Sequence, residues 1–343
     1  MINQKMKLVS LVALFVSGGI ASACLWDRDT ITDELQTRAT QYDLVMGQFP
    51  SHGETYYLKR IEKLEASAGK NPLLWNESND LAVAYIRTKQ FSKALLILKK
   101  NHETKAEDYH TLSNLGVLYK KQGNYADAAD YMRKALEIKP EGHMGLGDWY
   151  LKRLEWSKEN ESKSGMKPEL NFLGEKYSAL NLEFPWAKKN KDEDDLRAQY
   201  LTKLIKNDRH FSDGYLVMGD LLLRLGDLHL AMRCYQHAQH LKHPNPDELE
   251  QRIDSIIYHW ANKSYSANYN VPDLEKRRAT QKKTFLAELE KTEQWLSSFH
   301  AAEALLVQRG ETPDFDLTSK ENTTKRFRPV GKVGSKEKLK SRR

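Results

Sequence analysis

Residues 109–142 read YHTLSNLGVLYKKQGNYADAADYMRKALEIKPEG, and other parts of the chain align on this stretch. Short residues stand at Gly116, Ala128 and Ala135, whereas larger ones stand at Leu115 and Tyr119. Two antiparallel helices approach closely only where side chains are short, and larger side chains then fill the gaps between them. The stretch therefore predicts two packed helices joined by a turn.

The spacing of these residues resembles the tetratricopeptide repeat, a helix–turn–helix unit of about 34 residues. The same phase occurs directly before this stretch, in residues 75–108, at Leu81, Ala82, Tyr85 and Ala94. A third copy at 212–245 has its matching residues at Tyr215, Met218, Gly219, Leu222, Ala231, Tyr235 and Ala238. Residues 41–74 fit as a degenerate copy, because Pro50 would interrupt its first helix.

The composition agrees with an all-α fold, since 40% of the 343 residues are apolar and 29% are charged, with few prolines and glycines between them. We predict a tetratricopeptide-type helix-turn-helix array, an irregular α-solenoid, with a long C-terminal helix and a disordered tail. The predicted parts are a signal peptide (1–23), an N-terminal cover segment (24–40), helical repeats (41–142, made of 41–74, 75–108 and 109–142), an irregular helical insertion or a pair of eroded repeats (143–211), a repeat (212–245), capping and C-terminal helices (246–309) and a basic disordered tail (310–343).

The first residues have the pattern of a secretory signal. Lys5 and Lys7 precede an apolar run at 8–16, and the small residues Ala21 and Ala23 follow it. The run is too short to remain as a spanning helix, so the pattern predicts export from a bacterial cytoplasm. The predicted location is the periplasm of a Gram-negative bacterium, or its outer membrane through a lipid anchor.

Cys24 directly follows this leader and leaves three alternatives open. It stands where a bacterial lipoprotein carries its lipidated cysteine, although Ala21 stands where that family usually has leucine. Cleavage by ordinary signal peptidase would leave a free thiol instead. Because export permits disulfides, Cys24 could also pair with Cys234, the other cysteine of the sequence.

The positive charge of the chain is concentrated at its ends. Of the formal net charge of +7, the leader contributes +2 through its two lysines, and residues 320–343 contribute +8. Removing both contributions leaves −3 for residues 24–319, so the basic character gives no reason to expect nucleic-acid binding by the body. The tail itself suggests contact with anionic surfaces of the cell envelope, or simply a solvated terminus.

Tetratricopeptide arrays hold an extended peptide or a partner helix on the inner face of the first helix of each repeat, which predicts a protein or peptide partner here. The resemblance carries this role over to Asn79, Val83, Arg87, Ser113, Asn114, Val117, Lys120, Lys121, Leu216, Asp220, Leu223 and Arg224. The cations among them favour an acidic partner. The alternative is that these residues only solvate polar helix faces. The clamp with which some members grip acidic chaperone tails is not reproduced, since Val83 and Asp220 stand where asparagine would be expected or useful.

The segment Leu274–Gly310 predicts the longest helix. Its apolar stripe consists of Phe285, Leu289, Leu296, Phe299 and Leu306. The stripe favours docking along the array over pairing with a separate helix.

Three histidines, His237, His240 and His243, stand three residues apart, but no cysteine or acid at matching spacing joins them. We therefore predict exposed helix polarity there, with no metal site and no cofactor. The sequence contains no familiar catalytic motif, so the leading hypothesis is an exported, non-enzymatic scaffold. Two alternatives stay open: an enzyme or enzyme accessory with its site in 143–211, and a cell-envelope adaptor that acts through the basic tail.

Overall fold

The structure, a computed structural model, describes residues 39–142, 145–160, 167–179, 182, 191–261 and 273–311. The predicted signal peptide, Cys24, the cover segment as far as residue 38 and the basic tail from residue 312 lie outside these ranges. What the sequence suggests about those parts stays a prediction.

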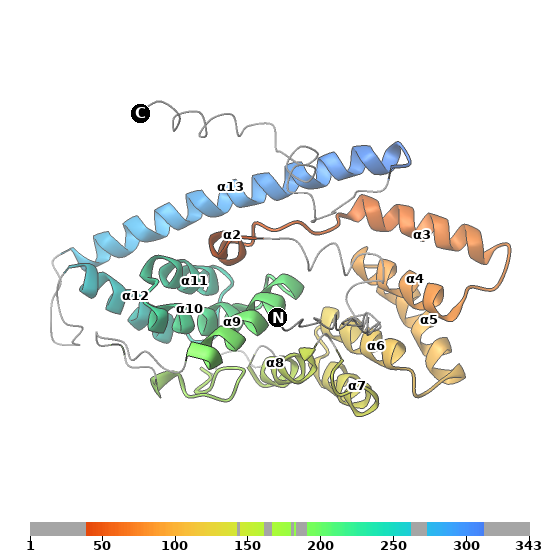
Figure 1. The fold of residues 1–343 in the computed structure, drawn as a ribbon, viewed down its shortest axis with the longest axis horizontal. Helices are drawn as coiled ribbons and strands as arrows, with labels where there is room; N and C mark the ends of the chain where they lie inside the picture. The colour runs from red at the N-terminus through yellow and green to blue at the C-terminus, as the bar shows by residue number, and fades with distance from the viewer. Residues whose placement is uncertain are drawn as a thin grey trace, which may run out of the picture.

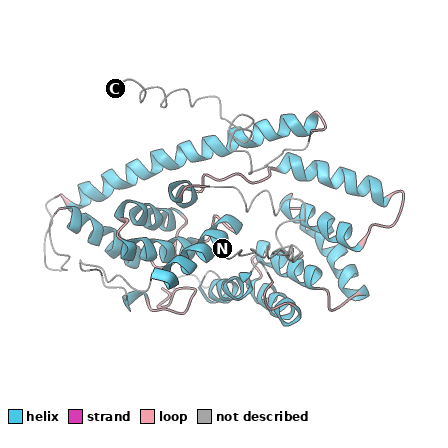
Figure 2. Ribbon diagram, in the orientation of Figure 1, coloured by secondary structure: helices cyan, strands magenta, loops and turns pink. Residues whose placement is uncertain are grey.

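Every regular element in the described ranges is a helix (Figure 1, Figure 2), which confirms the all-α prediction. The extended pairing found there is one isolated bridge between Leu170 and Lys176. In chain order the elements are α2 (Gln41–Met46), α3 (Glu54–Ala68), α4 (Trp75–Arg87), α5 (Phe91–Thr104), α6 (Tyr109–Lys121), α7 (Tyr125–Ile138), α8 (Gly147–Asn160), the 3₁₀ turn η2 (Tyr177–Ala179), α9 (Lys191–Asn207), α10 (Ser212–Leu225), α11 (Leu228–His240), α12 (Pro246–Trp260) and α13 (Leu274–Gln308). Among these helices, none combines the length and the apolar character that a bilayer span requires.

The pair α6 and α7 shows how the sequence builds one unit. Asp108 caps α6 by accepting a hydrogen bond from the backbone N–H of Thr111. Gly123 then makes the turn with a φ of 77°, a conformation that glycine adopts without strain. A Cβ on Gly116 would lie 3.1 Å from the carbonyl oxygen of Ala128. The short residues at these places therefore let the two helices touch, as the spacing predicts.

The pair α10 and α11 uses the same device. A Cβ on Gly219 would lie 2.4 Å from the ring of Tyr235, so only glycine leaves room for that ring. Tyr235 is fully buried, and it packs in the same apolar core as Met218 and Leu222 of α10. The corresponding places of the two copies thus serve the same packing function.

Helices α3 to α12 follow one another around an arc, and α13 runs across its open side (Figure 1). Near the start of the arc, α4 and α6 lie toward its inside, with α5 and α7 outside them. Helix α13 contacts α3 at one end of the arc and α11 and α12 at the other. Its Phe285 and Leu289 pack with Met46 of α2. The long C-terminal helix therefore docks along the array, as its apolar stripe predicts.

The region between the two clearest copies continues the array, because α8 packs against α7 and α9 packs against α10.

A short segment near the start of the described chain closes the array on its other side. Residues 47–53 lead from α2 to α3 beside α13 (Figure 1). We call residues 47–53 the strap. Between them, the strap and α13 connect the last helices of the arc to its first.

Candidate partner-binding surface

The twelve residues that the tetratricopeptide resemblance assigns to partner binding lie on α4, α6 and α10. Three of them, Arg87, Lys121 and Arg224, are at least partly exposed. The other nine are buried within this chain, namely Asn79, Val83, Ser113, Asn114, Val117, Lys120, Leu216, Asp220 and Leu223. A buried side chain cannot touch a partner in this conformation. A binding role for these nine therefore stays a prediction, and it would require neighbouring elements to move.

Two of the buried residues hold adjacent repeats together. The side-chain amide of Asn114 on α6 donates to Oδ1 of Asn79 on α4 over 3.3 Å. The hydroxyl of Thr111 donates to the same oxygen, also over 3.3 Å. The Asn79 amide nitrogen in turn donates to the carbonyl oxygen of Trp75 over 3.2 Å, so Asn79 bonds within the chain through both ends of its amide.

Asp220 on α10 is also occupied within the chain. Arg252 of α12 binds it through Nε at 2.7 Å and Nη2 at 3.1 Å, and the hydroxyl of Tyr235 donates to it over 3.0 Å. Arg252 is completely buried, and its remaining nitrogen, Nη1, binds the carboxylate of Glu248 at 2.5 Å. All three guanidinium nitrogens therefore have partners, which joins α12 firmly to α10.

A second buried ion cluster lies beside α6 and differs in its charge balance. Lys120 Nζ of α6 and Arg153 Nη2 of α8 both contact the same oxygen, Oδ2 of Asp208, at 2.6 Å and 2.5 Å. All three side chains are at most 6% exposed. Nε and Nη1 of Arg153 are buried without a hydrogen-bond partner among the described residues. Two cations thus share one carboxylate, and one positive charge is left over.

This imbalance affects the protonation of the cluster. Burial lowers the pKa of Lys120 to about 7, and the positive charge of Arg153 acts in the same direction against the attraction of Asp208. Burial alone would raise the pKa of Asp208, but Lys120 and Arg153 outweigh it and hold that pKa well below its usual value. Asp208 is therefore ionised at neutral pH, whereas Lys120 is close to releasing its proton.

Further basic side chains lie near the buried cluster. Lys121 of α6 is exposed, yet desolvation lowers its pKa, and the charges of Arg87 and Arg153 lower it further, whereas Asp208 raises it. His210 is 76% exposed, and its pKa is also lowered, first by desolvation and then by Lys121 among other cations. We call Arg87, Lys120, Lys121 and Arg153, together with Asp208, the cationic cluster.

A cluster of this kind is suited to electrostatic recognition. Lysine and arginine bind carboxylates through charge-assisted hydrogen bonds, which are about twice as strong as neutral ones. Lys121 and Arg87 are within electrostatic reach of the buried cluster and are themselves accessible. Both arginines of the predicted set have contacts within the chain, since Arg224 pairs with Asp194 of α9 at 3.4 Å and the Arg87 guanidinium lies 5.3 Å from the centre of the Tyr57 ring. A partner can therefore reach the cationic cluster through Lys121 and Arg87.

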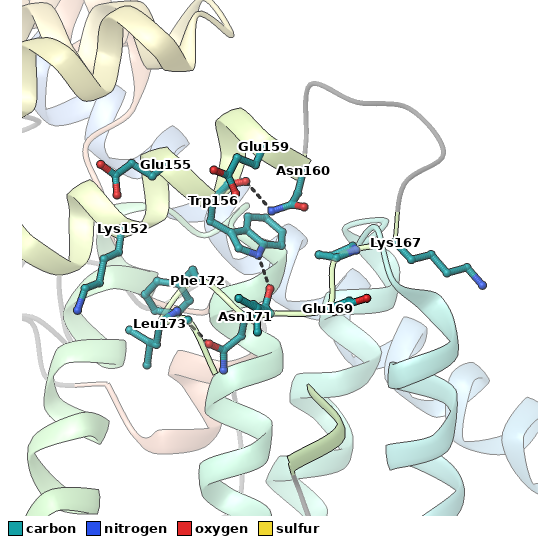
Figure 3. A pocket seen from close by; sticks show the side chains of 13 residues that line it. Lys152, Glu155, Trp156, Glu159, Asn160, Lys167, Glu169, Asn171, Phe172 and Leu173 are labelled. Atoms are coloured by element: carbon teal, nitrogen blue, oxygen red, sulfur yellow. Dashed lines mark hydrogen bonds between the residues drawn. The ribbon is translucent and has the colours of Figure 1, made fainter. Parts of the chain in front are cut away.

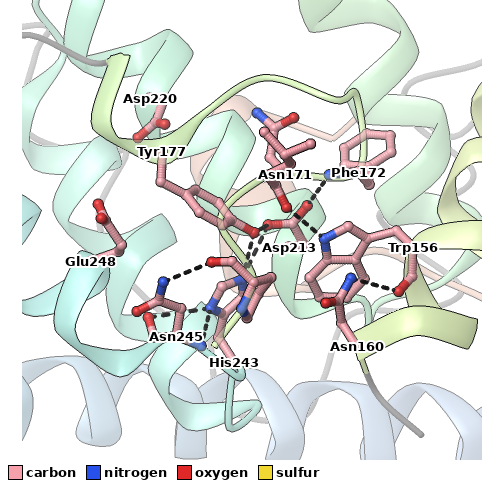
Figure 4. Close-up of polar contacts among 12 residues, drawn as sticks. Trp156, Asn160, Asn171, Phe172, Tyr177, Asp213, Asp220, His243, Asn245 and Glu248 are labelled. Carbon is pink, nitrogen blue, oxygen red and sulfur yellow. Dashed lines mark hydrogen bonds and ion pairs between the residues drawn. The ribbon is translucent and has the colours of Figure 1, made fainter. Parts of the chain in front are cut away.

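A buried network joins the 143–211 region to Asp213 of α10 and His243, and it is relevant to the enzyme alternative (Figure 4). The hydroxyl of Tyr177 donates to Oδ1 of Asp213 over 2.6 Å, and Nε2 of His243 lies 3.0 Å from the same oxygen. The backbone N–H of Phe172 donates to Oδ2 over 2.6 Å. The side chains of Asp213 and His243 have no exposed surface, so no substrate reaches them in this conformation. The network instead fastens the segment 167–179 onto α10.

A cavity of about 560 Å³ lies between α8 and the segment 167–174 (Figure 3). The indole N–H of Trp156 donates to the carbonyl oxygen of Leu170 across its floor, over 3.0 Å. Charged residues of both signs line it, among them Lys152, Glu155 and Glu159. Its described lining includes no histidine, cysteine or serine.

The prediction of exposed histidines is wrong for two of the three. His237 is 5% exposed, stacks on Tyr215 with ring centroids 4.0 Å apart, and contacts the carbonyl oxygen of Val45 at 2.8 Å. His243 is buried in the network around Asp213, and His240 is exposed. The spacing of the three residues does not predict this burial, because the segments that cover His237 and His243 come from distant parts of the chain. Among the described residues no group of three or more potential ligands could hold a metal ion.

Comparison with known families agrees with this architecture. Residues 109–142 and residues 212–242 each match a family model described as tetratricopeptide repeat. These two segments are similar to tetratricopeptide repeats. They contain α6 with α7 and α10 with α11, the two pairs whose glycines allow close helix contact. Arrays of such repeats present extended surfaces on which they bind other proteins. No curated protein sequence matches the chain.

Sequence reasoning missed the residues that complete both ion clusters. Arg153 and Asp208 lie in the region outside the repeat pattern, and Arg252 lies on the helix after the last repeat. Asp208 is 88 residues from Lys120, so no local spacing connects them. The sequence does contain one indication of a buried ion pair. Arg252 stands on an otherwise apolar helix face with Ile253 and Ile256, and a buried arginine requires an acidic partner.

Proposed function

We propose that this protein is a non-enzymatic scaffold that binds an acidic segment of a partner protein at the cationic cluster. The observation that carries the proposal is the sharing of one carboxylate, Asp208, by Lys120 and Arg153, with further cations at Arg87 and Lys121. The tetratricopeptide repeats support a protein partner in general, because proteins built from them use their surfaces for association.

Charge explains why the partner segment would be acidic. The lowered pKa of Lys120 shows that Asp208 only partly offsets the cost of burying two cations. A carboxylate that approaches Lys121 and Arg87 adds the missing negative charge. It would also favour the protonated form of Lys120, so binding and protonation would support each other.

The direct test is a binding assay with two fluorescein-labelled peptides of equal length, one rich in glutamate and the other with each glutamate replaced by lysine. The glutamate peptide should bind the full chain, and its affinity should fall as salt is raised because exposed charges take part. Equal binding of both peptides would contradict an electrostatic site.

A charge reversal locates the site. The double variant Arg87→Glu with Lys121→Glu should weaken binding of the glutamate peptide at least tenfold, because each reversal turns an attraction into a repulsion. The matched control is Lys99→Glu with Lys100→Glu, which changes the net charge equally at two exposed positions of α5. Loss of affinity in the control to the same extent would show that net charge, not the cationic cluster, governs binding.

The proposal includes export to the periplasm, where Cys24 would be the first mature residue or the point of lipid attachment. Its support is the sequence of residues 1–24 alone: two lysines, a short apolar run and small residues before the cysteine. The intact mass of the mature protein from a Gram-negative host tests both parts. A chain that keeps residues 1–23 would contradict export, and a Cys24 amine without acyl groups would contradict lipidation.

A further inference from the structure

The strap is held by side chains as an extended peptide ligand would be. Arg209 donates to the carbonyl oxygens of Gly47 and Phe49 over 3.4 Å and 3.2 Å, and its guanidinium lies 4.5 Å from the centre of the Phe49 ring. His300 of α13 contacts the next alternate carbonyl oxygen, that of Ser51, at 3.0 Å. All three polar contacts go to backbone carbonyl oxygens, so they recognise the main chain of the strap, which begins at Gly47 in the left-handed conformation that ends α2.

The end of the strap is fixed by one buried carboxylate. Glu303 of α13 has no exposed surface, and it accepts a hydrogen bond from the backbone N–H of Gly53 over 2.7 Å. Nδ1 of His52 lies 2.5 Å from its other oxygen. Gly53 immediately precedes α3, the first helix of the arc. Glu303 therefore fastens α3 to the far end of α13.

The start of the strap is fixed at the opposite end of the arc. The preceding helix, α2, packs against α11 and α13, and Met46 lies in a small apolar cluster with Phe285 and Leu289. His237 of α11 contacts the carbonyl oxygen of Val45 at 2.8 Å. Seven strap residues thus span the opening between the last repeat and the first helix of the array.

One loop connects the strap to the cationic cluster. Asp208 and Arg209 are neighbours in the turn between α9 and α10. Asp208 points to Lys120 and Arg153, whereas Arg209 holds the strap. Displacement of the strap would remove the contacts of Arg209 and so release the loop that positions Asp208.

We propose that the strap is a clasp that keeps the two ends of the array at a fixed spacing, and that the loop at 208–210 transmits its state to the cationic cluster. When the clasp is closed, Asp208 holds Lys120 and Arg153 in place, and the site is organised for an acidic segment. When it opens, this organisation is lost and the affinity falls. The coupling to the cationic cluster rests on the proposed function, whereas the clasp itself does not.

Spin labels test the clasp itself in the full chain. Labels at Ser67→Cys on α3 and Gln239→Cys on α11 occupy exposed positions at the two ends of the arc. Cys24→Ser removes one of the two native thiols. Cys234 has no exposed surface and stays unlabelled. With no further substitution, the distance between the two labels should have one narrow distribution. Glu303→Ala should broaden that distribution and increase the mean distance. The control Glu293→Ala changes an exposed residue of the same helix and should leave it unchanged.

His300→Ala provides a milder variant in case Glu303→Ala fails to fold, because His300 is only partly buried and contributes one contact to Ser51. Helical circular dichroism identifies which variants are folded. A narrow, unshifted distribution in a folded Glu303→Ala or His300→Ala protein would overturn the clasp.

Binding of the glutamate peptide to the same variants tests the coupling. An opened clasp should lower the affinity about fivefold or more, the lower end of coupling between linked sites. Opened ends with unchanged affinity would overturn the coupling and leave the clasp standing. Absence of binding to the wild type would instead overturn the proposed function, and the label distances would still decide the clasp.

Discussion

Two buried arginines, Arg252 and Arg153, each meet an aspartate, but their surroundings differ. All three nitrogens of Arg252 are bonded, and two carboxylates, those of Asp220 and Glu248, surround it. Arg153 bonds through Nη2 alone and shares its carboxylate with Lys120. The first cluster is complete within the chain, whereas the second has an excess of positive charge. We infer that the first serves stability and the second serves recognition.

The largest expected difference between the two clusters is in stability. Arg252→Met should lower the free energy of unfolding by about 3–5 kcal/mol, because Asp220 is left as a buried charge without its partner. Urea unfolding followed by circular dichroism measures this. Arg133→Met is the control, since it removes an arginine whose ion pair is about half exposed, and it should cost less than about 1 kcal/mol. A loss no larger than in the control would show that Arg252 is not needed for stability.

The pH dependence of stability should identify Lys120. Its pKa is about 7 in the folded protein and 10.5 when unperturbed, so between these values the unfolded chain binds more protons. The free energy of unfolding should therefore rise with pH across this window, by about 1 kcal/mol per pH unit, and level off below pH 7. Urea unfolding at several pH values, with Lys120→Met beside the wild type, isolates this contribution. Parallel profiles for the two proteins would contradict it.

The smallest effect is expected from removing the excess charge. Lys120→Met leaves Arg153 and Asp208 as a simple pair, so at pH 7 the free energy of unfolding should change by less than about 1 kcal/mol. Compared with Arg252→Met, the same type of substitution then has a much smaller effect on the free energy of unfolding. A loss of similar size in both variants, measured in the same urea experiment, would remove the distinction between them.

The fold follows from the sequence because its determinants are local. Gly116, Ala128 and Ala135 fix the contact between two helices that are adjacent in the chain, and Gly219 does the same for another pair. A repeated phase of short and large residues therefore predicts helix pairs from the sequence alone.

The site could not be predicted in the same way, because its geometry depends on distant segments. Lys120 becomes buried only because α8 and the loop at Asp208 cover it, and the sequence contains no sign of that contact. His237 is buried for the same reason, since α2 packs over it from nearly two hundred residues away. The repeat pattern predicts which residues lie on the inner face of each helix pair. It does not predict which distant segments of the chain pack over that face.

Proton exchange on binding tests the central claim most directly. Calorimetric titration of the glutamate peptide into the full chain at pH 7, in two buffers of different ionisation enthalpy, gives the number of protons taken up. If the peptide supplies the negative charge that the cationic cluster lacks, Lys120 should become protonated. The wild type should then take up about half a proton for each peptide bound, and Lys120→Met should take up none. Binding without proton uptake, or with equal uptake by both proteins, would contradict the account.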